Sequence, residues 1–352
     1  MEYIFYGAFP PENAMRRVAE KCVSDTNGEI LFYIDDKPDK IVNAIGYSGG
    51  VFSVEKIKDY PEAVIVVLFY AIEKALRKIR KMGGYNEVVG LPFLGFGFPY
   101  SNDRELSYKV SWTERHRDEI FNIYDCEDRY TNFIITEIIR QRKFKNFHFI
   151  SFEDANKFQY QPYFFDEKLN PRKDVTVIDC GAYIGDSFGD FKMAFGERLK
   201  KVYAFEFDQN NFDRMKEEAN VSGMNHITEC IMSGVSDRDE KVFISSFGNA
   251  YSHVSDTGIV QVRMSRLDSA IKEIIGTLCI KMDIEGYEVA ALKGAAELIR
   301  KNRPYMAICI YHKLDDILEV PRTIRDIAPH YNFYIRGGKH LECYAIPREH
   351  WT

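Results

Sequence analysis

The stretch VIDCGAYIGDS, Val177–Ser187, leads from an apolar run into a turn with two glycines. The run is typical of a buried strand, and the residues after Ser187 predict a helix. Glycine lets the backbone approach a ligand closely, and the first amides of a helix are free donors. We therefore expect a ligand at the carboxyl end of this strand. The expected contacts from this stretch are Asp179, Gly181, Ala182, Tyr183, Gly185, Asp186 and Ser187.

Acidic residues distinguish between two kinds of ligand for this turn. Asp179 and Asp186 would repel a pyrophosphate, but they suit the ammonium group of a methionine moiety beside a sulfonium centre. Glu206 lies 21 residues after Gly185, at the end of the next predicted strand, where an α/β unit presents an acid to ribose hydroxyls. A helix-capping role for Asp179 and an exposed strand-end position for Glu206 are the structural alternatives.

A second charged segment, KMDIEGYE, occupies residues 281–288. Alternation along the strand that it ends places Lys281 and Asp283 on one face. Glu285 and Glu288 are predicted to open a helix, whose first turn favours acids. Charges at the end of an apolar strand are costly to bury, which favours a catalytic role for Lys281, Asp283 and Glu285 over purely structural pairing.

His312 follows the next predicted strand, so we expect it beside Asp283 and Glu285. Histidine next to carboxylates at a strand end is a candidate general base. The alternative is that Asp283, Glu285 and His312 hold Mg²⁺ or Mn²⁺, which would acidify a bound diol. The sequence leaves both possibilities open.

The strand and helix pattern predicts three parts. Residues 1–98 read as a small parallel α/β domain, residues 99–158 as a helical connector, and residues 159–352 as a larger α/β domain. A short turn separates the last two predicted strands, Asn332–Ile335 and Leu341–Ile346, so they should form an antiparallel hairpin at the end of a parallel sheet. The aromatic stretch Tyr160–Phe165 is expected to be a lid or acceptor wall, or to pack against the sheet.

Three segments together resemble a known family: DCGAYIGD (residues 179–186), AFEFD (residues 204–208) and IKMDIEGYE (residues 280–288). Their types and order are similar to the FkbM family of S-adenosylmethionine-dependent methyltransferases, over about Gln159–Ile346. The resemblance implies a class I methyltransferase sheet and O-methylation, often of a sugar or polyketide hydroxyl. It also implies S-adenosylmethionine contacts at the turn, at Glu206 and Phe207, and at Ser233 beside the adenine. Ser252 and His253 could face the acceptor.

The first domain resembles the Rossmann-like domain at the start of some sugar-modifying bacterial enzymes. Only Gly7 remains of a dinucleotide-binding pattern, and Pro10 and Pro11 replace its second half. We therefore favour a role in homo-oligomerisation or acceptor recognition. The main prediction is a methyltransferase acting on a sugar, nucleotide sugar or glycan, in capsule, lipopolysaccharide or related biosynthesis. Alternatives are a nucleotide-sugar-binding protein or NAD-dependent oxidoreductase using the first domain, and a non-catalytic scaffold.

Composition supports this prediction. The 352 residues include 47 Lys and Arg against 53 Asp and Glu, a net charge of −6, so the basic excess of a nucleic-acid-binding protein is absent. The seven cysteines show no metal-binding spacing and predict reduced thiols. No apolar run is long enough to span a membrane. We therefore expect a cytoplasmic protein without nucleic-acid partners.

Overall fold

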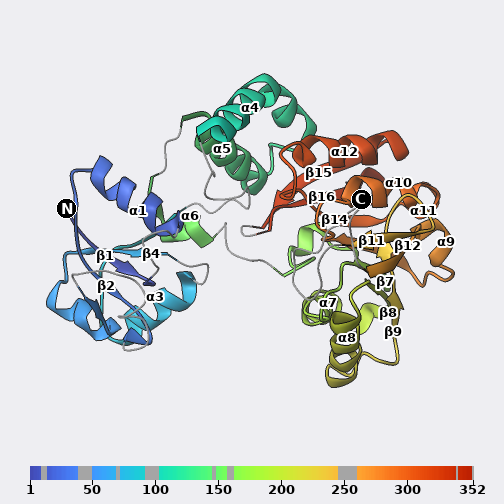
Figure 1. Cartoon of the computed structure of the whole chain (residues 1–352), viewed down its shortest axis with the longest axis horizontal. Helices are drawn as coiled ribbons and strands as arrows, with labels where there is room; N and C mark the ends of the chain where they lie inside the picture. The colour runs from blue at the N-terminus through green and yellow to red at the C-terminus, as the bar shows by residue number, and fades with distance from the viewer. Residues whose placement is uncertain are drawn as a thin grey trace. The chain divides into compact units, whose positions relative to one another are not determined.

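A computed structural model describes residues 1–8, 14–38, 50–68, 72–91, 103–144, 148–156, 162–244, 260–337 and 340–350. The chain forms two compact units (Figure 1). The first unit comprises residues 1–117, 133–160 and 337–340, and the second comprises residues 118–132, 161–336 and 341–352. The three domains predicted from the sequence, at residues 1–98, 99–158 and 159–352, remain a prediction. The sequence assigned roles to five residues that lie outside the described ranges, namely Pro10, Pro11, Tyr160, Ser252 and His253.

The first unit contains a sheet of the order β3-β2-β1-β4-β5-β6. Its strands are parallel except for β6, which runs antiparallel to β5. All four residues of β4 are buried, as expected for a strand covered on both faces. The strand bounds are β1 (Glu2–Tyr6), β2 (Glu29–Ile34), β3 (Val51–Phe52), β4 (Val64–Val67), β5 (Val88–Gly90) and β6 (Ile150–Ser151).

Helices α1 (Ala14–Asp25), α3 (Ile72–Lys81) and α6 (Phe152–Asn156) belong to the first unit. Two longer helices, α4 (Asp103–Ile123) and α5 (Arg129–Phe144), contribute residues to both units. They occupy most of the segment for which the sequence predicted helices.

The second unit contains a sheet of seven strands in the order β15-β16-β14-β13-β7-β8-β9. Strands β7, β8, β9, β13 and β14 are parallel, and β16 is antiparallel to both β14 and β15. The predicted mixed α/β fold with a terminal antiparallel hairpin is confirmed. The strand bounds are β7 (Val175–Cys180), β8 (Leu199–Glu206), β9 (Thr228–Met232), β13 (Thr277–Met282), β14 (Tyr305–Cys309), β15 (Tyr331–Arg336) and β16 (Glu342–Pro347).

Strand order reverses between β7 and β13, because β8 and β9 extend the sheet to one side and the later strands extend it to the other. Ligands of open α/β sheets bind outside the carboxyl ends of the strands at such a switch point. The turn after β7 and the acidic segment after β13 therefore meet where a ligand is expected.

Helices cover both faces of this sheet (Figure 1). Phe188 and Phe191 of α7 pack with Met215 and Ala219 of α8 in a buried core against β7 and β8. On the opposite side lie α10, α11 and α12. The helix bounds are α7 (Phe188–Phe195), α8 (Gln209–Val221), α9 (Leu267–Ala270), α10 (Glu288–Gly294), α11 (Ala296–Asn302) and α12 (Asp316–Ile327).

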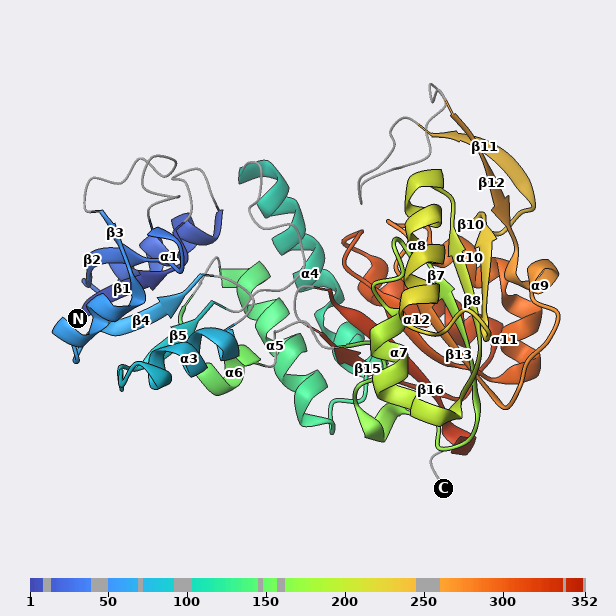
Figure 2. The ribbon, with the colours of Figure 1, turned by 90° about the horizontal axis from the view of Figure 1, so that it is seen from below.

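The helical segment that follows β13 is divided into two helices, because α10 ends at Gly294 and α11 begins at Ala296. At Gly294 an added Cβ would lie 2.0 Å from the Ser236 carbonyl oxygen, so a neighbouring chain segment crowds the break. Strands β10 (Gly234–Val235), β11 (Glu240–Ile244) and β12 (Val260–Ser265) make a small sheet that is separate from the seven-stranded one (Figure 2).

Candidate active site

A buried ion pair joins the two central strands at the switch point. Register places Asp179 of β7 opposite Lys281 of β13, and Lys281 Nζ lies 2.9 Å from Asp179 Oδ1. The side chains of Asp179 and Lys281 are 0% and 3% exposed, respectively. Burial by itself would lower the pKa of Lys281, but the charges of Asp179 and Asp283 outweigh it and raise the pKa. Lys281 therefore remains protonated.

This pairing gives Asp179 and Lys281 a structural function at the turn, beside the site roles that the sequence predicts for them. Ser187 donates a hydrogen bond to Asp179, and Lys281 Nζ donates to the Gly181 carbonyl oxygen at 2.7 Å. We expected Asp179 to contact a ligand and Lys281 to act in catalysis. In this structure the carboxylate of Asp179 is enclosed by protein groups, because its strand register directs it at Lys281. Both residues therefore hold the turn in place.

The turn after β7 is tightly fixed against β13. Gly181 has φ +79°, and an added Cβ there would lie 2.0 Å from the Asp283 carbonyl oxygen. The amides of Gly181 and Ala182 donate to the Phe205 carbonyl oxygen of β8. Tyr183 has φ +47°, a left-handed conformation that strains a non-glycine residue and is found preferentially at functional sites. Asp186, later in the turn, is exposed.

Gly181→Ala is expected to destabilise the second unit by about 2–4 kcal/mol, from left-handed strain and the clash with the Asp283 carbonyl. Thermal unfolding followed by circular dichroism measures the loss. Gly189→Ala is the matched control, because Gly189 lies in α7 and an added Cβ meets nothing within 4 Å. It should be neutral or stabilising by up to about 1 kcal/mol. Equal effects of the two changes would contradict this account.

Glu206 ends β8 beside the turn. Its side chain is buried, and Oε1 accepts a hydrogen bond from the Asp208 amide at 2.7 Å. Burial raises the pKa of Glu206 to about 7. The adjacent Phe207 packs against Val262 and Met264 of the small sheet. This carboxyl group can accept hydrogen bonds from hydroxyl donors, and its charge changes near neutral pH.

Ser233 lies at the neighbouring strand end, but protein groups engage its hydroxyl. Ser233 Oγ lies 2.9 Å from Ser265 Oγ and donates to the carbonyl oxygens of Gly234 and Arg263 at 2.8 and 3.1 Å. These contacts link the end of β9 to β12. Any contact of Ser233 with adenine would therefore come from its backbone rather than from a free hydroxyl.

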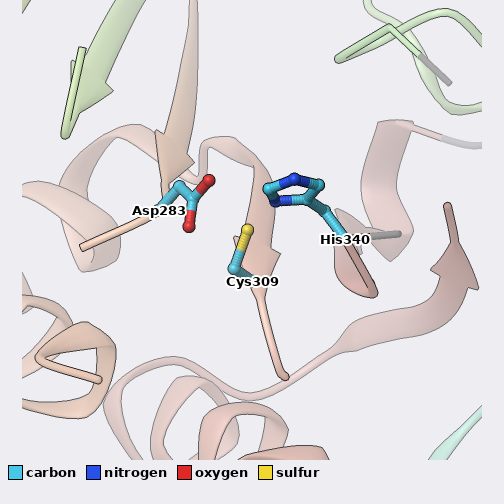
Figure 3. A group of neighbouring side chains, drawn as sticks. All are labelled: Asp283, Cys309 and His340. Atoms are coloured by element: carbon cyan, nitrogen blue, oxygen red, sulfur yellow. The ribbon is translucent and has the colours of Figure 1, made fainter. Parts of the chain in front are cut away.

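Asp283, directly after β13, receives two tyrosine hydroxyls. Tyr311 donates to Oδ1 at 2.9 Å, and Tyr163 donates to Oδ2 at 3.3 Å. Figure 3 shows Asp283 beside Cys309, the last residue of the adjacent strand; His340, also drawn, belongs to the first unit. Tyr163 lies 120 residues before Asp283, so no pattern in the sequence predicts their contact, whereas Tyr311 directly precedes His312, which the order of the strands already places beside Asp283.

The aromatic stretch around Tyr163 serves partly as packing. Tyr163 and Phe164 are buried in the core of the second unit, whereas Phe165 is 54% exposed. Lys281 Nζ lies 5.2 Å from the centre of the Tyr163 ring. Of the two predicted roles, packing applies to Tyr163 and Phe164, and Phe165 offers an exposed aromatic surface.

His312 is surrounded by carboxylates, as the sequence predicted for Asp283 and Glu285. Nε2 lies 3.4 Å from Asp283 Oδ1 and 3.5 Å from Glu285 Oε2, and Nδ1 lies 3.0 Å from Glu288 Oε1. Burial lowers the pKa of His312, but the carboxylates outweigh it, led by Glu288, so the pKa is raised.

Glu285 does not open the helix, contrary to the prediction. It adopts a left-handed conformation with φ +55° in the turn after β13, and α10 begins at Glu288. A further carboxylate, Asp316, comes from the start of α12. Ligand atoms of Glu288, His312 and Asp316 all lie within 4.8 Å of one another. Asp316 lay outside every motif in the sequence, so its proximity could not be inferred.

Comparison with known proteins agrees with this geometry. Residues 179–333, which contain the turn, Glu206 and the His312 cluster, match the family model described as the methyltransferase FkbM domain. The second unit contains an FkbM methyltransferase domain. The chain is therefore a methyltransferase, as predicted.

Solved structures extend the comparison beyond the FkbM domain. A methyltransferase FkbM from Methylobacillus flagellatus KT is 18% identical and has a TM-score of 0.56, with 98% of this chain and 89% of that chain covered. This similarity indicates a shared fold. A SAM-dependent methyltransferase from Aquifex aeolicus is 16% identical, covers 53% of this chain and 89% of its own, and has a TM-score of 0.33. No curated protein matched the sequence significantly.

Proposed function

We propose that the chain is an S-adenosylmethionine-dependent O-methyltransferase that acts on a sugar hydroxyl during glycan biosynthesis. The observation that carries the proposal is the meeting of three features at one switch point. They are the tight turn at Gly181, the carboxyl group of Glu206, and the cluster of Asp283, Glu285 and His312.

The residues of the FkbM domain fit S-adenosylmethionine. A strand-end carboxylate such as Glu206 suits the hydroxyls of the ribose, and the turn beside it permits close backbone approach. Gly181, Ala182, Tyr183, Gly185 and Asp186 would line the donor, while Asp179, Ser187 and Lys281 hold that turn. When bound, the donor would supply an activated methyl group.

The acidic cluster would hold and deprotonate the acceptor. Methyl transfer to a hydroxyl needs the attacking oxygen aligned with the methyl carbon and its proton removed, and positioning supplies much of the rate. Asp283, Glu285 and His312 are the candidate proton acceptors. The carboxylates also suit hydrogen bonds from neighbouring hydroxyls of a sugar, and the exposed ring of Phe165 offers an apolar surface for stacking.

Donor binding should depend on pH through Glu206. Hydroxyl donors favour the charged carboxylate, so affinity for S-adenosylmethionine should rise with pH between about pH 6 and 8, by up to about tenfold per unit below the pKa. Calorimetry across this range should show weaker binding and a smaller pH dependence in Glu206→Gln. The difference between the two proteins isolates Glu206 from titration of the donor itself. Identical affinities and pH dependences would contradict the assignment.

The acceptor class is tested in cells that produce the protein. Mass spectrometry of surface glycans with and without the gene should show the loss of a methyl group, and the gene for Asp283→Asn should not restore it. Unchanged glycans, together with normal donor binding by the purified protein, would contradict the acceptor class alone and would favour a small hydroxylated metabolite.

The first unit is proposed to serve homo-oligomerisation or recognition of the acceptor. Its strand order around β1 and β4 matches a doubly wound nucleotide-binding half. Yet Asp36, at the end of β2, accepts from Tyr6 at 2.5 Å and Lys78 at 2.6 Å, and Asp35 accepts from the Ala8 amide at 3.3 Å. Protein donors therefore engage the acids that NAD would need, which disfavours the oxidoreductase alternative.

Cytoplasmic location and the absence of nucleic-acid partners remain proposals based on composition. Within the described ranges, no helix is both long and apolar enough to cross a bilayer.

A further inference from the structure

The side chains of Glu288, His312 and Asp316 come from separate elements and lie close together. Glu288 begins α10, His312 follows β14, and Asp316 begins α12. Their nearest ligand atoms lie within 4.8 Å of one another. We propose that Glu288, His312 and Asp316 bind a divalent first-row transition metal of the Zn²⁺ or Mn²⁺ type. This set differs from the Asp283, Glu285 and His312 set that the sequence suggested.

Buried polar atoms in the cluster support a bound cation. Glu288 is fully buried, and among the residues that the structure describes its Oε2 atom finds no hydrogen-bond partner. The side chain of His312 is 7% exposed, and neither ring nitrogen makes a hydrogen bond of acceptable geometry within the described part of the chain, although carboxylates lie nearby. Buried polar atoms without partners cost free energy. Coordination would satisfy Glu288 and one nitrogen of His312 at the same time.

The surroundings are those of a supported metal site. Glu288 Oε1 accepts from the amides of Ile284 and Gly286 at 3.0 and 3.4 Å, and Asp316 Oδ2 accepts from the Lys313 amide at 2.7 Å. These hydrogen bonds orient both carboxylates.

The Nε2 edge of the His312 ring, opposite the edge that faces Glu288, also has carboxylates nearby. With Nδ1 facing Glu288 and coordinated, the proton resides on Nε2, which lies 3.4 Å from Asp283 and 3.5 Å from Glu285. Metal-bound histidines usually donate the N–H of their second nitrogen to a carboxylate, and Asp283 and Glu285 are the carboxylates nearest to that nitrogen.

The charge of the cluster and the types of its ligand atoms indicate which cation it would bind. The charge of Lys281 is paired with Asp179, and Lys313 Nζ donates to the Gly286 carbonyl oxygen. A divalent cation would balance Glu288 and Asp316. One imidazole with two carboxylates favours a transition metal, since Mg²⁺ and Ca²⁺ prefer oxygen ligands throughout. In that arrangement His312 Nε2 carries a proton, so Asp283 or Glu285 would deprotonate the acceptor.

Metal content tests the site independently of methyl transfer. The full-length protein is stripped with a chelator and titrated separately with Zn²⁺, Mn²⁺ and Mg²⁺, with stoichiometry from atomic emission and affinity from calorimetry. We expect one Zn²⁺ or Mn²⁺ per chain. Glu288→Gln and Asp316→Asn should each weaken binding more than about 100-fold, beyond the 10–100-fold typical of residues that only orient ligands.

Controls separate lost ligation from lost folding. Glu285→Gln, on the far edge of the ring, should weaken binding less than either ligand variant. Circular dichroism must show native secondary structure for each variant. With Co²⁺, the wild type should give a visible absorption spectrum that changes in His312→Gln.

Three results would overturn the proposal. They are no binding of Zn²⁺ or Mn²⁺, equal binding in folded ligand variants and wild type, or tighter binding of Mg²⁺ than of both. Because none of these measurements uses S-adenosylmethionine or an acceptor, a failure here is distinguishable from a failure of the proposed function.

Discussion

Lys281→Met is expected to destabilise the second unit by about 3–5 kcal/mol, because it leaves the Asp179 carboxylate buried without its cation. Asp179 is 0% exposed, and Lys281 also donates to the Gly181 carbonyl oxygen. The change therefore removes charge compensation and one contact to the turn together. Urea unfolding of the full chain, followed by circular dichroism, measures the shift. A chain of two compact units is not expected to unfold in one transition, so the transition that Gly181→Ala also shifts is assigned to the second unit and compared.

Two controls test whether the loss of stability comes from burial of the unpaired charge. The exposed pair Lys21 and Asp25 lies at a similar distance of 2.8 Å, and Lys21→Met should cost less than about 1 kcal/mol. The double variant Asp179→Leu with Lys281→Met removes both charges and should recover much of the lost stability. Similar small costs for Lys281→Met and Lys21→Met would contradict a structural role for the buried pair.

Local patterns predicted the parts of the site that are local in the chain. The apolar run of β7 followed by Gly181 and Gly185 indicated a strand, turn and helix, and spacing indicated Glu206 at the next strand end. Parallel strands place their carboxyl ends at one edge, so Asp283 and His312 could also be predicted to meet.

Contacts that depend on register or on distant segments could not be predicted. Alternation placed Lys281 on a face of its strand, but pairing with Asp179 depends on the register between β7 and β13. Tyr163 reaches Asp283 from 120 residues away. Glu285 was expected in a helix because acids favour first turns, yet the turn after β13 holds it in a left-handed conformation.

Asp283→Asn is expected to lower kcat by about 10²–10⁴-fold while leaving affinity for S-adenosylmethionine nearly unchanged. Asp283 follows β13 at the switch point, and its backbone oxygen faces Gly181 of the proposed donor turn. Tyr311 and Tyr163 fix the carboxylate, which favours a group that orients an acceptor and takes its proton. Single-turnover rates with a methylated product as readout, and calorimetry for the donor, separate the two quantities.

Matched variants identify the proton acceptor within the cluster. Tyr311→Phe removes only one hydrogen bond to Asp283, so its effect on kcat should be much smaller. If Glu285→Gln loses activity while Asp283→Asn keeps it, Glu285 is the base and Asp283 is not. His312→Gln should reduce kcat less than Asp283→Asn if the ring only orients Asp283 and Glu285. If the imidazole takes the proton, the rate of the wild type should fall at low pH as the ring becomes protonated. A larger loss of kcat in His312→Gln than in Asp283→Asn, together with the loss of that fall, would identify His312 as the proton acceptor.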